Sequence, residues 1–315
     1  MKLLAHFLTL VRVRNLFFIA LTQLLFYFCI ARPQLANHPG AVSTLGLSEL
    51  AILMLASVLI AAGGYVINDY FDRDIDSVNR PQTAVLGTRI GRRWGIFWHL
   101  ALSLSGMSLS LLLTLRTGNW LVFLFNSLAV LLLWVYSTSF KKEVLIGNIV
   151  ISLLTAWVVL VVYVSEVGLN LTRLRDAQRG YIMAIYRIGI LYGAFAFMAS
   201  VIREVVKDLE DMPGDARYGC RTMPIVWGVR ASKVFVSVWM IVLFFALFAL
   251  AVYSLMLQWW MFAGFIAFAV MWPLGRAFKL LLDSSATEDY TRLSRLVKWV
   301  MFNGILSMLF FMIYE

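Results

Sequence analysis

The sequence predicts an all-α protein that crosses a membrane many times. Hydrophobic residues make up 62% of the 315 residues, whereas charged residues make up only 14%. The apolar residues gather in nine stretches, each close to the roughly 20 residues that a helix needs to span a bilayer. A helix satisfies its backbone hydrogen bonds within one segment, as a spanning segment must. We therefore expect a polytopic membrane protein with nine transmembrane helices, in which 1–315 forms a single domain.

The nine stretches follow one another along the chain with polar connections of unequal length. The connections at 116–119 and 256–258 are very short, which predicts antiparallel pairing of the helices on either side. The second stretch runs directly into a polar motif, and its helix is expected to end near Asn79, because the position before Pro81 avoids helical geometry. The expected spans are 15–32, 47–66, 94–115, 119–136, 144–165, 182–202, 234–255, 259–281 and 296–314.

The distribution of basic residues predicts the orientation in the membrane. If the N-terminus is cytoplasmic, 21 of the 27 Lys and Arg residues lie in cytoplasmic segments, as the positive-inside rule requires. The one exception is the outer loop 166–181, which carries three arginines. The sequence therefore predicts a cell-membrane protein with a cytoplasmic N-terminus and cytoplasmic acidic motifs. The formal net charge of +10 mostly reflects this bias and does not indicate nucleic-acid binding.

An acidic motif follows the second span. Residues 68–76 read Asn-Asp-Tyr-Phe-Asp-Arg-Asp-Ile-Asp, which contains Asp-x2-Asp-x3-Asp. At about 100° per helical residue, Asp69, Asp72 and Asp76 fall within an arc of about 60°, whereas Asp74 lies off that face. Ionisable residues at the edge of a membrane span are costly, so three on one face suggest a function rather than a solvated helix end.

A second motif with the same aspartate spacing follows the sixth span. Residues 207–215 read Lys-Asp-Leu-Glu-Asp-Met-Pro-Gly-Asp. Asp208, Asp211 and Asp215 would share a face if the helix continued, with Glu210 off that face. However, Pro213 is expected to end or kink this helix, which would put Asp215 just past the regular turns. Six carboxylates with this spacing are typical of a site that holds a diphosphate through Mg²⁺.

Several further polar residues are candidates for contacts to phosphate. Tyr136 and Lys141 lie between the fourth and fifth spans, and Asn15 lies with Arg14 at the start of the first. Each pattern taken alone is typical of an interfacial anchor or a helix cap. Beside two acidic motifs, they become candidate phosphate ligands. Gln23, His99 and Asn126 inside the spans are instead interpreted as interhelical hydrogen-bonding groups.

The motifs together resemble those of a known family. Asn68-Asp69-x2-Asp72-x3-Asp76 is similar to the NDxxDxxxD motif of the UbiA superfamily of intramembrane prenyltransferases. Lys207-x3-Asp211-x2-Gly214-Asp215 resembles its second motif, KxxxDxxGD, and Tyr136-Ser137 with Lys141 resembles its YSxxxK loop. The motif order along nine spans agrees, so the resemblance covers nearly the whole chain. Segment 203–215 looks most like the geranylgeranylglycerol-phosphate geranylgeranyltransferase branch.

The resemblance implies a nine-helix bundle around a central cavity, with cytoplasmic helical caps formed by 67–93 and 203–233. The implied reaction is Mg²⁺-dependent transfer of a prenyl group from an isoprenoid diphosphate to a lipophilic or aromatic acceptor among the membrane lipids, with release of pyrophosphate. The implied metal ligands and catalytic residues are Asn68 together with Asp69, Asp72, Asp76, Asp208, Asp211 and Asp215. The implied substrate-binding residues are Asn15, Asn68, Arg80, Tyr136, Lys141, Arg203 and Lys207.

Other functions remain open at the level of sequence. The acceptor could be a glycerol phosphate ether lipid such as geranylgeranylglycerol phosphate, or an aromatic quinone precursor of the 4-hydroxybenzoate or naphthoate type. A more distant alternative is a cation- or proton-coupled transporter, since intramembrane carboxylates also serve ion relays. Transporter sites usually lie near the middle of the membrane on broken helices, whereas these carboxylates follow the ends of spans.

The predicted orientation can be tested by cysteine labelling. In a variant without Cys29 and Cys220, Ser77→Cys should react with a membrane-impermeant maleimide only from the cytoplasmic side. Asn170→Cys should react only from the opposite side, because the charge bias places 166–181 outside. Reversed labelling would place both acidic motifs outside the cell and contradict the predicted topology.

Overall fold

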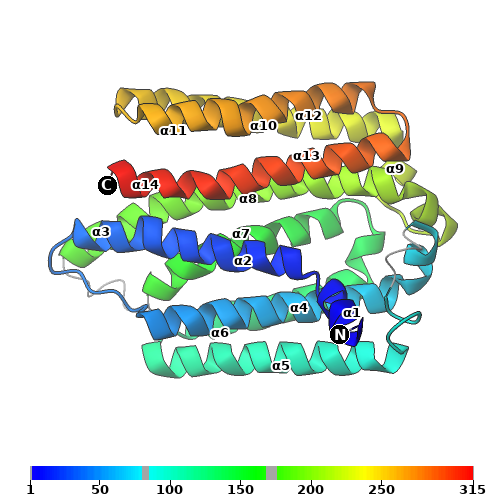
Figure 1. Ribbon diagram of the computed structural model, residues 1–315, viewed down its shortest axis with the longest axis horizontal. Helices are drawn as coiled ribbons and strands as arrows, with labels where there is room; N and C mark the ends of the chain where they lie inside the picture. Colours follow the sequence, from blue (N-terminus) through cyan, green and yellow to red (C-terminus); the bar gives the residue numbers. More distant parts are fainter. Residues whose placement is uncertain (1, 80–84, 168–175, 315) are drawn as a thin grey trace. The chain divides into compact units, whose positions relative to one another are not determined.

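The computed structural model describes residues 2–79, 85–167 and 176–314, and these residues are almost entirely helical (Figure 1). Within them no strand forms, and Leu86 and Ile90 make an isolated bridge. The helices are α1 (Lys2–Leu10), α2 (Val13–Leu25), η1 (Phe26–Ala31), α3 (Arg32–Ala36), α4 (Leu47–Asn79), α5 (Arg92–Thr117), α6 (Trp120–Thr138), η2 (Phe140–Lys142), α7 (Ile146–Val167), α8 (Asp176–Arg217), α9 (Met223–Val226), α10 (Gly228–Met256), α11 (Trp260–Phe265), η4 (Ile266–Met271), α12 (Trp272–Asp283), α13 (Thr287–Leu306), η5 (Ser307–Phe310) and α14 (Phe311–Tyr314).

The described residues contain nine helical segments that are long and apolar enough to cross a membrane, which confirms the predicted number. The segments that carry the acidic motifs are unusually long. The α4 helix has 33 residues and α8 has 42, well beyond the roughly 20 that a bilayer requires. The extra turns follow the apolar part of each helix and carry the motifs, so the described part of each expected cap is largely a helical continuation of a span.

The chain divides into two compact units. Unit 1 consists of Met1–Phe140 and Trp157–Ile190, and unit 2 consists of Lys141–Ala156 and Leu191–Glu315. The first acidic motif belongs to unit 1 and the second to unit 2, while α7 and α8 each contribute to both. The central cavity of the expected bundle stays a prediction.

In unit 1, α4 packs against α5 and α6, and α2 also contacts it. Two glycines allow α4 and α5 to approach closely. A Cβ atom at Gly106 of α5 would lie 2.7 Å from Cγ1 of Ile60 and 3.0 Å from the carbonyl oxygen of Ala56. A Cβ atom at Gly63 of α4 would lie 2.5 Å from Oγ of Ser103. Small residues at such contacts are common between membrane helices, and here they set the position of the helix that carries the first motif.

The lone polar residues of the spans form hydrogen bonds between helices, as the sequence predicted. All of these bonds lie within unit 1 and satisfy groups that would otherwise be buried without partners. They join Nε2 of Gln23 to Oγ of Ser57 (2.9 Å), Nδ1 of His99 to the carbonyl oxygen of Gly63 (3.0 Å) and Nδ2 of Asn126 to Oγ of Ser110 (2.9 Å).

The end of α8 in unit 2 corrects one expectation. The helix continues through Pro213 to Arg217, so Asp215 lies on a regular helical turn rather than beyond it. Proline removes the single backbone donor that would bond to the carbonyl of Leu209. The helix tolerates this loss because the preceding turns are held by packing, with Val205, Val206 and Leu209 almost fully buried.

The close approach of α4 and α5 predicts how two glycine substitutions differ in their effect on stability. Gly106→Ala should lower the free energy of unfolding by about 1–3 kcal/mol, because the backbone carbonyl of Ala56 cannot move aside cheaply. Gly275→Ala in α12 is the matched control, since no atom lies within 4 Å of its added Cβ. This substitution should raise the free energy of unfolding by up to about 1 kcal/mol. Thermal unfolding of both purified variants in detergent measures the difference. A Gly106→Ala midpoint at or above that of Gly275→Ala would contradict the packing described for α4 and α5.

Candidate active site

The first acidic motif lies on the last turns of α4, and its aspartates differ in burial as the helical period predicts. The side chain of Asp72 is buried, with 3% of the residue exposed. In contrast, the Asp74 side chain is 61% exposed and forms an ion pair with its neighbour Arg73 (2.8 Å). Asp69 and Asp76, on the face of Asp72, are partly buried. The structure therefore confirms that Asp74 lies apart from the other three aspartates.

Asn68 and Asp72 form a buried pair one helical turn apart. The amide of Asn68 donates from Nδ2 to Oδ2 of Asp72 over 2.6 Å. The other polar atom of the same side chain, Oδ1 of Asn68, is buried and has no hydrogen-bond partner among the described residues. A buried carbonyl oxygen without a partner is costly in free energy, and it suits a bound cation or a hydrogen-bond donor. This oxygen lies beside the carboxylate of Asp72, which the nitrogen of the same Asn68 amide already orients.

Asp69 is held by a residue that the sequence analysis did not single out. The Nη2 atom of Arg12 forms an ion pair with Oδ1 of Asp69 at 2.7 Å, and the guanidinium also lies over the ring of Tyr65, 5.1 Å from its centre. Burial by itself would lower the pKa of Arg12, but Asp69, Tyr65 and Asp76 together outweigh this and raise the pKa above its ordinary value. Arg12 therefore remains a fixed positive charge next to the first motif.

The backbone around Arg12 explains how this side chain reaches α4. Arg12 has left-handed dihedral angles (φ 53°, ψ 53°) and separates α1 from α2. For a residue other than glycine this conformation costs on the order of 1–2 kcal/mol, so surrounding contacts must hold it. The neighbouring Leu10 and Val11 supply such contacts, since both are buried in an apolar cluster with Ala62 and Val66 of α4.

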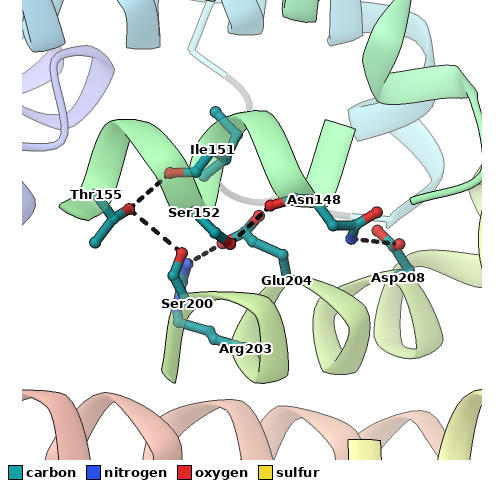
Figure 2. A network of polar contacts seen from close by, with 8 residues as sticks. All are labelled: Asn148, Ile151, Ser152, Thr155, Ser200, Arg203, Glu204 and Asp208. Atoms are coloured by element: carbon teal, nitrogen blue, oxygen red, sulfur yellow. Dashed lines mark hydrogen bonds and ion pairs between the residues drawn. The ribbon is translucent and has the colours of Figure 1, made fainter. Parts of the chain in front are cut away.

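The second motif lies on α8 in unit 2, and here too an amide holds an aspartate. Figure 2 shows Nδ2 of Asn148, near the start of α7, donating to Oδ2 of Asp208 over 2.8 Å. Asp215 is buried and Asp211 is half-buried. Glu210, predicted to lie off this face, accepts a hydrogen bond from Thr291 of α13 (2.9 Å), so it serves as a contact between helices.

A buried ion pair precedes the second motif by one turn. Arg203 pairs with Glu204, whose side chain is almost fully buried, and Nε of Arg203 is buried without a hydrogen-bond partner among the described residues (Figure 2). Lys207, one turn further along α8, is half-buried. The cations predicted to contact phosphate in this motif thus lie on the same helix as its aspartates.

The remaining predicted residues are less closely tied to the motifs. Asn15 is half-buried in the first turn of α2, Tyr136 is buried near the end of α6, and Lys141 is half-buried in η2. The backbone amide of Arg221, which follows α8, donates to the carbonyl of Lys142 over 2.7 Å and fixes this loop within unit 2. Arg80 lies outside the described residues.

The structure brings together the residues of each motif but forms no complete metal-ligand cluster. In the part of the chain that it describes, no three His, Cys, Asp or Glu side chains converge on one point. Each motif is instead arranged within its own unit, and the convergence of all six aspartates stays a prediction.

Sequence reasoning missed Arg12 and Asn148, the partners of Asp69 and Asp208. The available signal for Asn148 was the spacing Asn148-x3-Ser152-x2-Thr155, which places polar groups on one face of an apolar span. Arg12 gave a weaker signal, because a basic residue before the first span is also expected from the positive-inside rule.

Comparison with known proteins agrees with this architecture. Over 229 residues the chain is 35% identical to a protein of Methanothermobacter thermautotrophicus named digeranylgeranylglyceryl phosphate synthase, a match that covers 69% of this chain and 72% of the relative.

Two solved structures share the fold. A structure described in connection with digeranylgeranylglyceryl phosphate synthase in membranes matches with a TM-score of 0.65 at 23% identity, over 98% of this chain and 99% of the other. A UbiA homologue from Archaeoglobus fulgidus bound to DMAPP and Mg²⁺ matches with a TM-score of 0.57 at 14% identity, over 96% and 98% of the two chains.

The model of the family described as "UbiA prenyltransferase family" matches residues 11–302, which include both acidic motifs and almost all of the spans. The chain therefore belongs to the UbiA prenyltransferase family.

Proposed function

We propose that this prenyltransferase transfers a prenyl group from an isoprenoid diphosphate to a glycerol phosphate ether lipid in an Mg²⁺-dependent reaction that releases pyrophosphate. The observation that carries the proposal is the buried pair of Asn68 and Asp72 inside an Asp-x2-Asp-x3-Asp motif that recurs on α8. The amide oxygen of this pair has no hydrogen-bond partner among the described residues. The DMAPP and Mg²⁺ of the Archaeoglobus fulgidus homologue support the choice of donor and metal.

The residues present fit a magnesium site. Mg²⁺ prefers oxygen ligands and is usually held by one or two carboxylates together with substrate phosphates. Within the residues that the structure describes, Oδ1 of Asn68 has no hydrogen-bond partner, and the carboxylate of Asp72 lies next to it. When bound, the metal would neutralise the negative charge that develops on the departing diphosphate. The proposed ligands are Asn68, Asp69, Asp72, Asp76, Asp208, Asp211 and Asp215.

The side chains of the protein bind and orient the substrates. Lysine contributes a point charge and arginine a fork of donors, so both suit phosphate oxygens. Arg12 and the amide of Asn68 hold the carboxylates of the first motif in place before the substrate arrives. The proposed contacts to phosphate are Arg80, Lys141, Arg203 and Lys207, together with Asn15 and Tyr136.

The glycerol phosphate acceptor is supported by the name of the relative from Methanothermobacter thermautotrophicus, a digeranylgeranylglyceryl phosphate synthase. We propose geranylgeranylglycerol phosphate as the acceptor class. The active-site loops and the N-terminus are proposed to be cytoplasmic, with 1–315 acting as one domain; the strong bias in Lys and Arg supports this orientation.

The proposed reaction can be tested with the purified protein in detergent. We expect labelled geranylgeranyl diphosphate to be transferred to geranylgeranylglycerol phosphate, with release of pyrophosphate and loss of turnover in EDTA. The control acceptors are 4-hydroxybenzoate and a naphthoate. Preferred transfer to either aromatic acid would contradict the glycerol phosphate acceptor, and turnover that persists in EDTA would contradict the role of Mg²⁺.

The two faces of α4 predict a contrast between two isosteric substitutions. Asp72→Asn keeps an oxygen that can accept from Asn68 but removes the charge, so we expect turnover to fall on the order of 100-fold or more while the protein stays folded. Asp74→Asn removes an exposed carboxylate and should have little effect. Initial rates at saturating Mg²⁺ measure the contrast. Equal losses in both variants would show that the assignment of the two faces is wrong.

A further inference from the structure

A line of polar side chains joins the first half of α7 to α8 in unit 2. On α7, Asn148, Ser152 and Thr155 share one helical face, and on α8, Ser200, Glu204 and Asp208 do the same (Figure 2). Hydrogen bonds cross between the helices along this line. One joins Asn148 to Asp208, and another joins the hydroxyls of Thr155 and Ser200 over 3.3 Å.

The bond between Asn148 and Asp208 differs in kind from its neighbour, because it ends on an aspartate of the acidic motif. Asn148 is buried, with 7% of the residue exposed, and its amide bonds Oδ2 of Asp208. Within the part of the chain that the structure describes, Oδ1 of Asp208 takes part in no hydrogen bond. The amide therefore fixes the carboxylate through one oxygen and leaves the other for a ligand.

A neutral partner suits an aspartate that must bind a cation. An arginine or lysine in the place of Asn148 would add a positive charge beside Asp208, whereas an amide orients the carboxyl group and adds no charge that would compete with a cation. The backbone of Asn148 is held in the first turns of α7, where its backbone carbonyl accepts a hydrogen bond from Oγ of Ser152 (2.7 Å). The loop before α7 is fixed to the segment after α8 by the bond between Arg221 and Lys142.

We propose that Asn148 is a positioning residue that holds Asp208 so that its second oxygen is presented to the divalent cation of the prenyl-transfer site. This inference rests on the proposed function, in which Asp208 is a metal ligand. Groups that orient metal ligands through hydrogen bonds commonly strengthen metal binding by about 10- to 100-fold. A purely structural Asn148 would affect folding and leave metal affinity unchanged.

The test measures binding of Mn²⁺, as a spectroscopic substitute for Mg²⁺, to the full-length protein by electron paramagnetic resonance titration. Asn148→Ala should weaken Mn²⁺ binding about 10-fold or more and raise the Mg²⁺ concentration needed for half-maximal turnover. The matched control is Thr155→Val, which removes the other hydrogen bond between the same helices without touching an aspartate. It should bind Mn²⁺ as the wild-type protein does.

An exchange of the two side chains separates positioning from packing. The double variant Asn148→Asp with Asp208→Asn keeps one amide and one carboxylate at the contact, so its unfolding midpoint should stay near that of the wild-type protein. Its carboxylate now lies on α7, and we expect Mn²⁺ affinity to remain weak. If Asn148→Ala fails to fold, Asn148→Leu, which has nearly the same shape and also lacks the amide donor, takes its place in the Mn²⁺ titration.

Several outcomes would overturn the proposal. Wild-type Mn²⁺ affinity in either Asn148→Ala or the exchanged variant would show that Asn148 does not position a metal ligand, and an equal loss in Thr155→Val would assign the effect to helix packing. The absence of saturable Mn²⁺ binding in the wild-type protein would instead contradict the proposed function itself.

Discussion

Carboxylates at the end of a membrane span need partners, and this requirement shapes much of the structure. Moving an ionised carboxyl group out of water costs more free energy than the burial of its carbon atoms provides, unless a hydrogen-bond donor or a cation lies against it. Three aspartates of the acidic motifs each have such a partner. Arg12 pairs with Asp69, and amides serve Asp72 and Asp208. The break between α1 and α2 lies at Arg12, the residue that pairs with Asp69 of α4.

The two kinds of partner have different consequences for chemistry. An arginine places a positive charge beside its aspartate, so Arg12 holds Asp69 through one oxygen and offsets part of its charge. An amide orients its aspartate without adding a positive charge that would compete with a cation. Asn68 also offers an oxygen ligand of its own, because its amide oxygen is buried and has no hydrogen-bond partner within the described residues. The protein thus combines an ion pair at Asp69 with amides that orient the carboxyl groups of Asp72 and Asp208.

Long helices carry these groups out of the apolar part of the protein. In α4 and α8 the same helix first spans the membrane and then continues as the motif, so packing along the span also fixes the direction of the aspartates. Close contact at Gly63 and Gly106 sets α4 against α5, and buried valines anchor α8 ahead of Pro213. The precision of each motif therefore depends on packing several turns away from it.

The sequence alone determined the helical class, the nine spans and the exposed position of Asp74, because each of these follows from local periodicity, and it indicated the family through the resemblance of its motifs. It could not identify Arg12 or Asn148 as partners of Asp69 and Asp208, since those contacts join residues 57 and 60 positions apart. It also placed Asp215 beyond the helix, because a local rule for proline takes no account of packing. Tertiary structure decided these points, since only the packing of distant helices shows which donor satisfies each buried carboxylate and which strained or interrupted turn is held in place.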